Sequence, residues 1–182
     1  KGWKELADGR IVITHGDTLL HSGSPWKREI LAAGTRVDEI WSRFPRAEHD
    51  IDDRIEVARA VARELCTVEY PTGRHFIQRA IDAVLPPRRA VMMLDAWLHE
   101  GASGARFCDQ YFPQAEFLIL GHFHHHGCWN RSGRVVIDTG SFMSPARACW
   151  VEWNDGRLSH GVIDEAPGRC AKGRILNVWR LR

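Results

Sequence analysis

AEFLILGHFHHHGCWN, residues 115–130, is the most informative stretch of this sequence. Its apolar run at residues 116–120 predicts a buried strand, because a short continuous apolar run suits a strand that is covered on both faces. Four of the chain's ten histidines follow within five positions, at His122, His124, His125 and His126. On extended backbone, side chains two positions apart point the same way. His122 and His124 are therefore predicted to present two nitrogens to one small volume.

A second histidine, His15, also follows a short β-branched run, at residues 10–14. Like His122 it stands next to a glycine, which lets the backbone turn tightly. Neutral imidazole is the commonest protein ligand for metals such as zinc, and it also suits iron and manganese. We therefore predict a metal site at the ends of two neighbouring strands, with these ligands: His15, His122 and His124.

The other histidines are interpreted differently. We expect His125 and His126 at the rim of the site. We expect ordinary core or loop positions for the remaining five: His21, His49, His75, His99 and His160.

Helical periodicity dominates the region between the two histidine segments. Apolar spacing, N-cap residues and stop signals predict helices at residues 24–34, 35–44, 50–66, 75–85, 88–101 and 101–113. Strands are predicted afterwards at residues 116–120, 134–142 and 173–182, with a hairpin around the turn at residues 154–156. This order predicts one α/β (α+β) domain over residues 1–182, in which residues 24–113 form a helical insertion.

Composition excludes several classes of protein. Hydrophobic residues are 44% and charged residues 26% of the chain, as in ordinary globular proteins. The formal net charge of +2 is too small to argue for a nucleic acid or an anionic membrane as partner. No apolar run is long enough to span a bilayer. The five cysteines are widely spaced and include no C-x-x-C pair, so the expected setting is reducing and cytoplasmic.

Three motifs resemble those of the calcineurin-like metallophosphoesterases. GHFHHHG, residues 121–127, resembles the Gly-His-x-His motif that closes that family's site, and VITHGD, residues 12–17, resembles its preceding single-histidine motif. VVIDTGSF, residues 135–142, resembles the strand and Gly-Ser turn that follow. The segment THGDTLL, residues 14–20, is most similar to the branch that contains UDP-2,3-diacylglucosamine hydrolases.

The resemblance implies a fold, a chemistry and a set of ligands. The fold would be a four-layer α-β-β-α sandwich, in which two sheets are faced by helices. The activity would be hydrolysis of a phosphate monoester, diester or pyrophosphate by two divalent ions (Mn, Fe or Zn), which together clamp a phosphoryl group. His15 and His122 would hold one ion and His124 the other. The partner would be a phosphorylated small-molecule or nucleotide substrate.

The chain also departs from the family pattern. The family's Asp-x-His, Gly-Asp-x-x-Asp and Gly-Asn-His-Asp/Glu motifs do not occur in the sequence, and they would supply the bridging carboxylate and the catalytic histidine. Phe123 replaces a common threonine, and His125 and His126 replace a common Arg-Pro pair. The sequence therefore offers no catalytic residue of its own and no assigned substrate-binding residue. We expect it to be the C-terminal part of an enzyme whose N-terminal part is missing, weakly active or inactive alone.

Two alternatives remain at this stage. The chain could be a non-catalytic metal-binding or interaction module with a degenerate phosphoesterase fold. It could instead be a phosphodiesterase that binds nucleic acid through a basic tail, which we rank last because charges near chain ends are usually solvated. The tail would comprise Arg169, Lys172, Arg174, Arg180 and Arg182.

Overall fold

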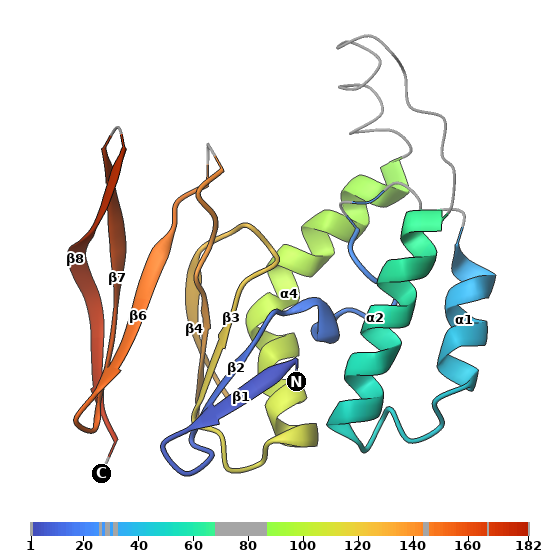
Figure 1. The fold of residues 1–182 in the computed structure, drawn as a ribbon, viewed down its shortest axis with the longest axis horizontal. Coiled ribbons are helices and arrows are strands. Elements are labelled where there is room, and N and C mark those ends of the chain that lie inside the picture. Colours follow the sequence, from blue (N-terminus) through green and yellow to red (C-terminus); the bar gives the residue numbers. More distant parts are fainter. Residues whose placement is uncertain are drawn as a thin grey trace, which may run out of the picture. The chain divides into compact units, whose positions relative to one another are not determined.

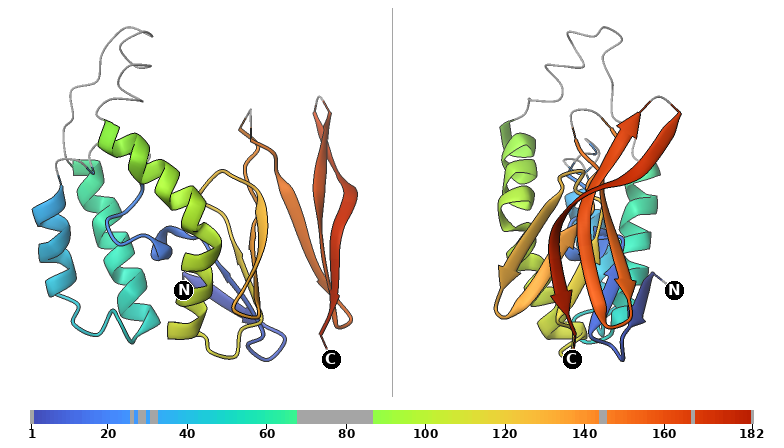
Figure 2. Two further views of the ribbon diagram at one scale, coloured as in Figure 1. Left: turned by 180° about the vertical axis from the view of Figure 1, so that it is seen from behind. Right: turned by 90° about the vertical axis from the view of Figure 1, so that its left-hand side faces the viewer.

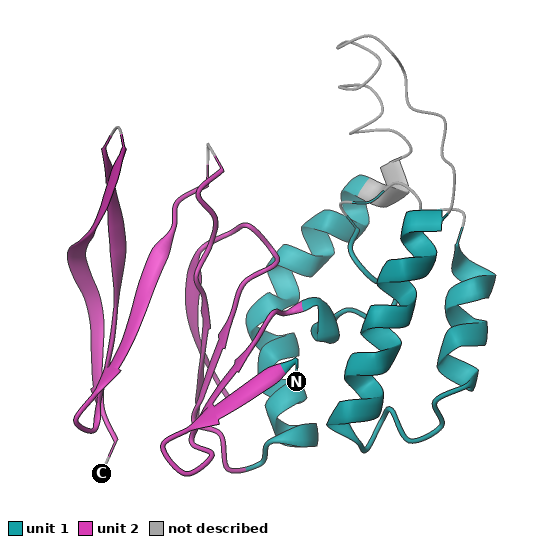
Figure 3. Cartoon of the chain, viewed as in Figure 1, with its two compact units in different colours: residues 1–2, 17–113 teal, residues 3–16, 114–182 magenta. Residues whose placement is uncertain are grey.

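The computed structural model describes residues 2–181 except 26, 28–29, 31–32, 68–86, 144–145 and 167. The chain divides into two compact units, residues 1–2 with 17–113 and residues 3–16 with 114–182 (Figure 3). The first unit is helical and the second is built of strands (Figure 1). The mixed α/β class predicted from the sequence is thereby confirmed. The prediction that residues 1–182 form one domain with an insertion stays a prediction.

The helical unit contains η1 (Asp17–Leu19), α1 (Gly34–Ser42), α2 (Ile51–Thr67) and α4 (Pro87–Tyr111). Asp50 begins α2, because its carboxylate accepts the backbone N–H groups of Asp52 and Asp53 at 2.8 and 3.2 Å. Those two acids lie in the first turn, where their negative charges interact favourably with the positive end of the helix dipole. The N-terminus of α2 thus follows directly from the sequence pattern.

The helices pack on one another through their apolar faces, as their periodicity predicts. α1 and α2 lie side by side (Figure 1). Their shared core is supplemented by partly buried side chains that include Trp41 and Met92. Its buried members are Ile30, Ala33, Val37, Ile40, Ala47, Val57, Val61 and Leu65.

Two helix predictions need correction, and a third lies outside the described residues. The described positions among residues 24–33 form turns with a single 3-10 position rather than an α-helix. The helices expected at 88–101 and 101–113 are one continuous helix, α4, which runs through Gly101 and Gly104. Both glycines are buried, and the helix continues through them despite the low helix propensity of glycine. The helix expected at 75–85 falls within residues 68–86, which the structure does not describe.

The strand unit contains two sheets. The five-stranded sheet has the order β1-β2-β3-β5-β4. Its strands are β1 (Trp3–Leu6), β2 (Ile11–Thr14), β3 (Phe117–Leu120), β5 (Arg134–Asp138) and β4 (Gly127–Arg131). β2, β3 and β5 are parallel neighbours, and β1 and β4 pair antiparallel at the two edges. All four residues of β3 are buried, as expected for a central strand of a parallel sheet.

The second sheet has the order β6-β7-β8 and is antiparallel throughout. Its strands are β6 (Cys149–Asn154), β7 (Arg157–Ala166) and β8 (Arg169–Arg180). The predicted turn at residues 154–156 joins β6 to β7. β8 is an edge strand among the described residues, and it exposes Ile175, Leu176 and Val178 at 48, 38 and 47%.

The two sheets pack face to face and share one apolar core, and two views show them side by side (Figure 1, Figure 2). From the first sheet this core takes Ile11, Phe117, Ile119, Val135 and Ile137, and from the second it takes Leu158. Partly buried residues that include Trp179 complete it, with the Trp179 and Phe117 rings edge to face at 5.4 Å between centroids. These two sheets match the central layers of the four-layer sandwich expected from the sequence.

Strands β1 and β4 were not predicted. β1 has the sequence WKEL and β4 the sequence GCWNR, so neither shows the apolar run that marks the buried strands. Both lie at sheet edges, where polar residues are tolerated because one side meets solvent. Among the described residues, no helix is long and apolar enough to cross a lipid bilayer.

His160 lies in the interior of the strand unit. Its side chain on β7 is 2% exposed, and its Nδ1 lies 3.3 Å from the Asn177 amide nitrogen on β8. Burial lowers the pKa of His160 below its ordinary value of 6.5, and the nearby His126 lowers that pKa further. His160 is therefore held in the neutral form, in the core position expected for it.

Leu158→Ala should lower the free energy of unfolding by about 2–5 kcal/mol, because Leu158 is fully buried between the sheets. Leu176→Ala is the matched control from the same sheet, and its exposed side chain predicts a change below about 1 kcal/mol. Chemical denaturation followed by circular dichroism measures both. Equal changes in the two variants would contradict the assigned core.

Acidification should destabilise the fold through His160. Because its folded pKa is lowered, the unfolded chain takes up a proton that the folded chain does not. Its contribution is complete above pH 6.5 and is lost as the pH falls below that value. His160→Gln should therefore flatten the dependence of unfolding free energy on pH below 6.5, compared with the unsubstituted chain. An unaltered slope in His160→Gln would show that the pKa of this histidine is the same in the folded and unfolded chains.

Candidate functional site

His15 and His122 come together at one edge of the five-stranded sheet. β2 and β3 are parallel neighbours, with Ile13 beside Ile119, so the loops that follow the two strands start at the same end of the sheet. The two imidazole rings lie 4.9 Å apart between centroids, with their planes at 74°. Ligand sites collect outside the carboxyl ends of parallel strands. The meeting of these two histidines, predicted from the sequence, is confirmed; their role as metal ligands stays a prediction.

Gly16 makes this meeting possible. Its φ of +99° lies in the left-handed region, which L side chains rarely adopt. A Cβ at this position would lie 2.6 Å from the Gly121 carbonyl oxygen and 3.3 Å from the His122 Cβ. The loop after β2 therefore lies directly against the loop after β3. The glycine beside each histidine was noted in the sequence, and the structure shows the reason for one of them.

Residues 121–126, which we call the histidine loop, do not have the extended backbone that was expected from the sequence. His122 and His124 have φ values of +82° and +56°. Positive φ at two non-glycine residues is costly and is concentrated at functional sites. It also invalidates the argument that these two side chains point the same way. His124 is exposed, and the described residues include no hydrogen-bond, ion-pair or ring partner for its side chain.

Buried side chains hold the loop in place. Phe123 is 1% exposed and presents its ring edge-on to His122 at 5.7 Å. The Thr139 hydroxyl and backbone N–H both donate to the Leu120 carbonyl, at 3.2 and 2.9 Å. Asp138 is fully buried and accepts the Gly140 N–H at 2.7 Å. Asp138 was assigned no role from the sequence, although a carboxylate that ends an apolar strand just before a glycine turn is the signal that would have identified it.

The remaining histidines were expected at the rim of the site or at ordinary core and loop positions, and the rim assignment stays a prediction. His125 is exposed, whereas His126 is half-buried with its ring 6.1 Å from that of His125. A Cβ on Gly140 would lie 2.9 Å from the His126 Cβ, so the turn after β5 packs on this residue. His99 is exposed and lies 2.9 Å from the Asp95 carboxylate. His75 lies outside the described residues.

The His15–His122 pair fits part of a metal site. Two imidazoles that bind one ion through Zn–N bonds of about 2.0–2.1 Å place their ring centroids roughly 5 Å apart. The observed 4.9 Å is compatible with that arrangement. However, within the described part of the chain no group of three or more His, Cys, Asp or Glu side chains is placed to hold a metal. Burial and the nearby Asp138 raise the pKa of the Cys149 thiol above its ordinary value.

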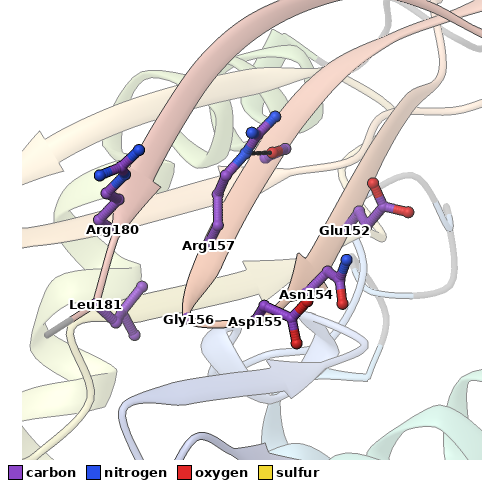
Figure 4. Close-up of a pocket in the computed structure, with 8 residues that line it drawn as sticks. Glu152, Asn154, Asp155, Gly156, Arg157, Arg180 and Leu181 are labelled. Carbon is purple, nitrogen blue, oxygen red and sulfur yellow. Dashed lines mark hydrogen bonds between the residues drawn. The ribbon is translucent and has the colours of Figure 1, made fainter.

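A broad hollow lies elsewhere in the strand unit, on the three-stranded sheet (Figure 4). Its volume is about 810 Å³, and its charged lining residues include Arg157 and Arg180, which are directly opposite on β7 and β8. Arg157 Nε donates to the Ser159 hydroxyl at 3.2 Å, and Glu152 pairs with Lys172. Both arginines are exposed, so water satisfies their remaining donors. The hollow therefore does not demand a ligand.

Much of the basic tail considered in the sequence analysis forms strand β8. Four of its five residues lie on that strand, and the fifth, Arg182, lies outside the described residues. Lys172 is engaged with Glu152 and lies 5.2 Å from the Trp150 ring. The tail is therefore part of a sheet rather than a loose basic segment.

No protein-family model and no curated protein matches the chain. Among solved structures it is similar to vacuolar protein sorting 29 (Vps29) from Cryptosporidium parvum, with 12% identity over 43% of this chain and 44% of that chain and a TM-score of 0.33. It is also similar to a single mutant of Vps29 from Entamoeba histolytica, with 22% identity over 42% of this chain and 47% of that chain and a TM-score of 0.30. The chain spans less than half the length of either structure. Similarities this weak carry no argument, and none of them supports the UDP-2,3-diacylglucosamine hydrolase branch.

Gly16→Ala should destabilise the chain by about 2–4 kcal/mol, since it adds both backbone strain and a clash with the Gly121 carbonyl. It should also separate His15 from His122, which histidine-selective NMR would detect as shifts of both imidazole signals. Gly133→Ala is the matched control, because Gly133 also has positive φ but has open space around it. Its expected change is about 1 kcal/mol, with both imidazole signals unmoved. Equal effects of the two substitutions would show that the close approach at Gly16 is unimportant.

Proposed function

We propose that this chain carries part of the metal site of a calcineurin-like metallophosphoesterase, which hydrolyses a phosphate monoester, diester or pyrophosphate. One observation supports the proposal above all: His15 and His122, far apart in the sequence, meet with ring centroids 4.9 Å apart at the carboxyl ends of neighbouring parallel strands. The sequence motifs around both residues agree with it. The substrate would be a phosphorylated small molecule or nucleotide.

The residues of this chain would contribute ligands and their positioning. His15 and His122 would hold one divalent ion, and His124 would contribute to a second. When bound, two such ions (Mn, Fe or Zn) supply charge that stabilises a phosphoryl group during displacement. Gly16 allows the two loops to approach, and buried Phe123 anchors the loop between His122 and His124. The strained φ values of His122 and His124 are consistent with a loop shaped for ligation rather than for stability.

Charge balance limits what these three residues do alone. Imidazoles are neutral ligands and do not offset two divalent charges, so a dinuclear site needs carboxylates as well. The family's bridging carboxylate has no counterpart in this sequence. The catalytic group and the bridging ligand would therefore come from the N-terminal motifs that the sequence analysis expects in the complete enzyme.

A non-catalytic metal-binding or interaction module is the second candidate. It is favoured by a specific observation, namely that no cluster of three or more ligand side chains forms among the described residues. Such a module would retain the histidine pair and bind one ion weakly, without turnover. The two candidates differ in what happens when the N-terminal motifs are supplied.

The 182-residue chain should bind Mn²⁺ or Zn²⁺ weakly and hydrolyse an aryl phosphate or phosphodiester little or not at all. A longer chain that carries the upstream Asp-x-His and Gly-Asn-His motifs should gain both metal content and manganese-dependent turnover. In that longer chain, His122→Ala and His124→Ala should each reduce activity by at least about 100-fold, as loss of a metal ligand does. Elemental analysis and steady-state hydrolysis assays measure these quantities.

His49→Ala is the matched control in the longer chain, because His49 is exposed in the helical unit and belongs to no histidine motif. It should leave metal content and turnover within about twofold. Full activity in the short chain would contradict the incomplete-site interpretation. A longer chain that is metal-loaded but inactive would favour the non-catalytic module.

A further inference from the structure

A small hollow of about 250 Å³ lies within the helical unit, where η1, α1, α2 and α4 contribute side chains. It is smaller than the hollow on the three-stranded sheet, but its lining is more chemically distinctive. Aromatic and cationic side chains face it together with polar ones. The residues that matter to the argument are Thr18, His21, Trp41, Glu48, Arg54 and Arg106.

Arg54 is the central residue of this hollow. It is half-buried on α2, its Nε donates to the Thr18 carbonyl at 2.8 Å, and its guanidinium carbon lies 4.4 Å from the centroid of a Trp41 ring. Burial lowers the pKa of Arg54, which shows that its charge is held partly out of water. Among the described residues, no carboxylate forms an ion pair with it and no acceptor takes its two terminal nitrogens. The Glu48 carboxylate acts on Arg54 through its charge and not through a hydrogen bond, so the two terminal nitrogens of Arg54 can still donate to a bound anion.

Arg106 adds a second positive charge to the hollow, whereas His21 is neutral and Glu48 is acidic. Arg106 on α4 is exposed, with one terminal nitrogen donating to the Ser103 hydroxyl at 3.2 Å. The His21 ring is stacked on Trp41, with centroids 4.3 Å apart and planes at 14°. Burial lowers the pKa of His21, and the charge of Arg54 lowers it further, so His21 is neutral near pH 7. Glu48 is the acidic residue among those that line the hollow.

We propose that this hollow binds the phosphate group of a small phosphorylated molecule, with Arg54 and Arg106 as its ligands. Two forked guanidinium groups offer more donors than a carboxylate can accept, and they match the several oxygens of a phosphate. Arg54 is already oriented by the Thr18 carbonyl and by Trp41, so little conformational freedom is lost on binding.

The aromatic side chains indicate the remainder of the ligand. His21, Trp41, Phe107 and Tyr111 give the hollow flat aromatic surfaces beside its polar and charged groups. A phosphate attached to an aromatic or heterocyclic ring would use both parts of this lining, whereas inorganic phosphate would use only the arginines. Its volume limits the ligand to a small molecule. None of these residues is a proposed metal ligand, so this inference does not rest on the proposed function.

The charge of Glu48 should affect phosphate binding in the opposite direction to the charges of Arg54 and Arg106. Its carboxylate lies among the groups that face the hollow, and it would repel a phosphate that binds there. Removing its charge should therefore tighten phosphate binding, while removing the charge of Arg106 should weaken it. A structural role for either residue would not produce opposite changes.

The test is isothermal titration calorimetry of the 182-residue chain with phenyl phosphate at low ionic strength, with EDTA present so that no metal contributes. Inorganic phosphate and phenol are titrated separately to distinguish the two parts of the ligand. Phenyl phosphate should bind at one site, more tightly than either. Arg106→Gln should weaken binding roughly 10- to 100-fold, as expected for a lost charge-assisted hydrogen bond.

Glu48→Gln should strengthen binding of phenyl phosphate by roughly two- to fivefold at low salt. Arg54→Lys retains the charge but loses the fork and should weaken binding; Arg106→Gln serves if that variant does not fold. Arg59→Gln is the matched control. Like Arg106, Arg59 is an exposed arginine on a helix and bonds to a residue three positions earlier, which is Glu56. Unlike Arg106, it does not line the hollow. Absence of saturable binding at millimolar phenyl phosphate, or equal losses in Arg106→Gln and Arg59→Gln, would overturn the proposal.

Discussion

The close approach of two backbone loops, at Gly16 and Gly121, is the constraint on which the histidine site depends. Parallel pairing of β2, β3 and β5 brings the ends of distant segments to one edge of the sheet. Pairing alone would leave the loops a side chain apart, and the missing Cβ of Gly16 removes that gap. The histidines then meet because their backbones do. This order of causes, from strand pairing to loop contact to ring proximity, explains how two histidines that are far apart in the sequence come together.

Much of the fold could be predicted because the informative residues are local. Strands β2, β3 and β5 could be predicted from their short apolar runs. The start of α2 could be predicted from Asp50 and the acidic residues that follow it. The edge strands β1 and β4 could not be found, since a strand exposed to solvent carries no apolar pattern. The continuity of α4 through Gly101 and Gly104 was also hidden, because glycine signals a helix end in isolation whereas tertiary packing decides the outcome.

The two sites were predictable to very different degrees. His15 and His122 were found because each directly follows an apolar strand, and the approach of their rings needed only the strand pairing to be parallel. The direction of His124 could not be deduced, because the positive φ of His122 and His124 is a property of the folded loop. No pattern in the sequence predicted the hollow around Arg54. Thr18, Trp41 and Arg106 lie on three separate elements, and nothing in their spacing indicates that they share a surface with Arg54.

Within the part of the chain that the structure describes, β8 is an edge strand, and this has a consequence for how the protein behaves in concentrated solution. An unpaired strand edge offers N–H and C=O groups to a second chain, and the exposed Ile175, Leu176 and Val178 add apolar surface to that edge. Arg174 and Arg180 lie on the same strand, so two copies that meet there bring like charges together. This repulsion acts through solvent, and its range falls to a few ångströms at high salt concentration. Colloidal stability is therefore tied to ionic strength: the cations keep molecules apart in dilute buffer, and screening them favours edge-to-edge aggregation.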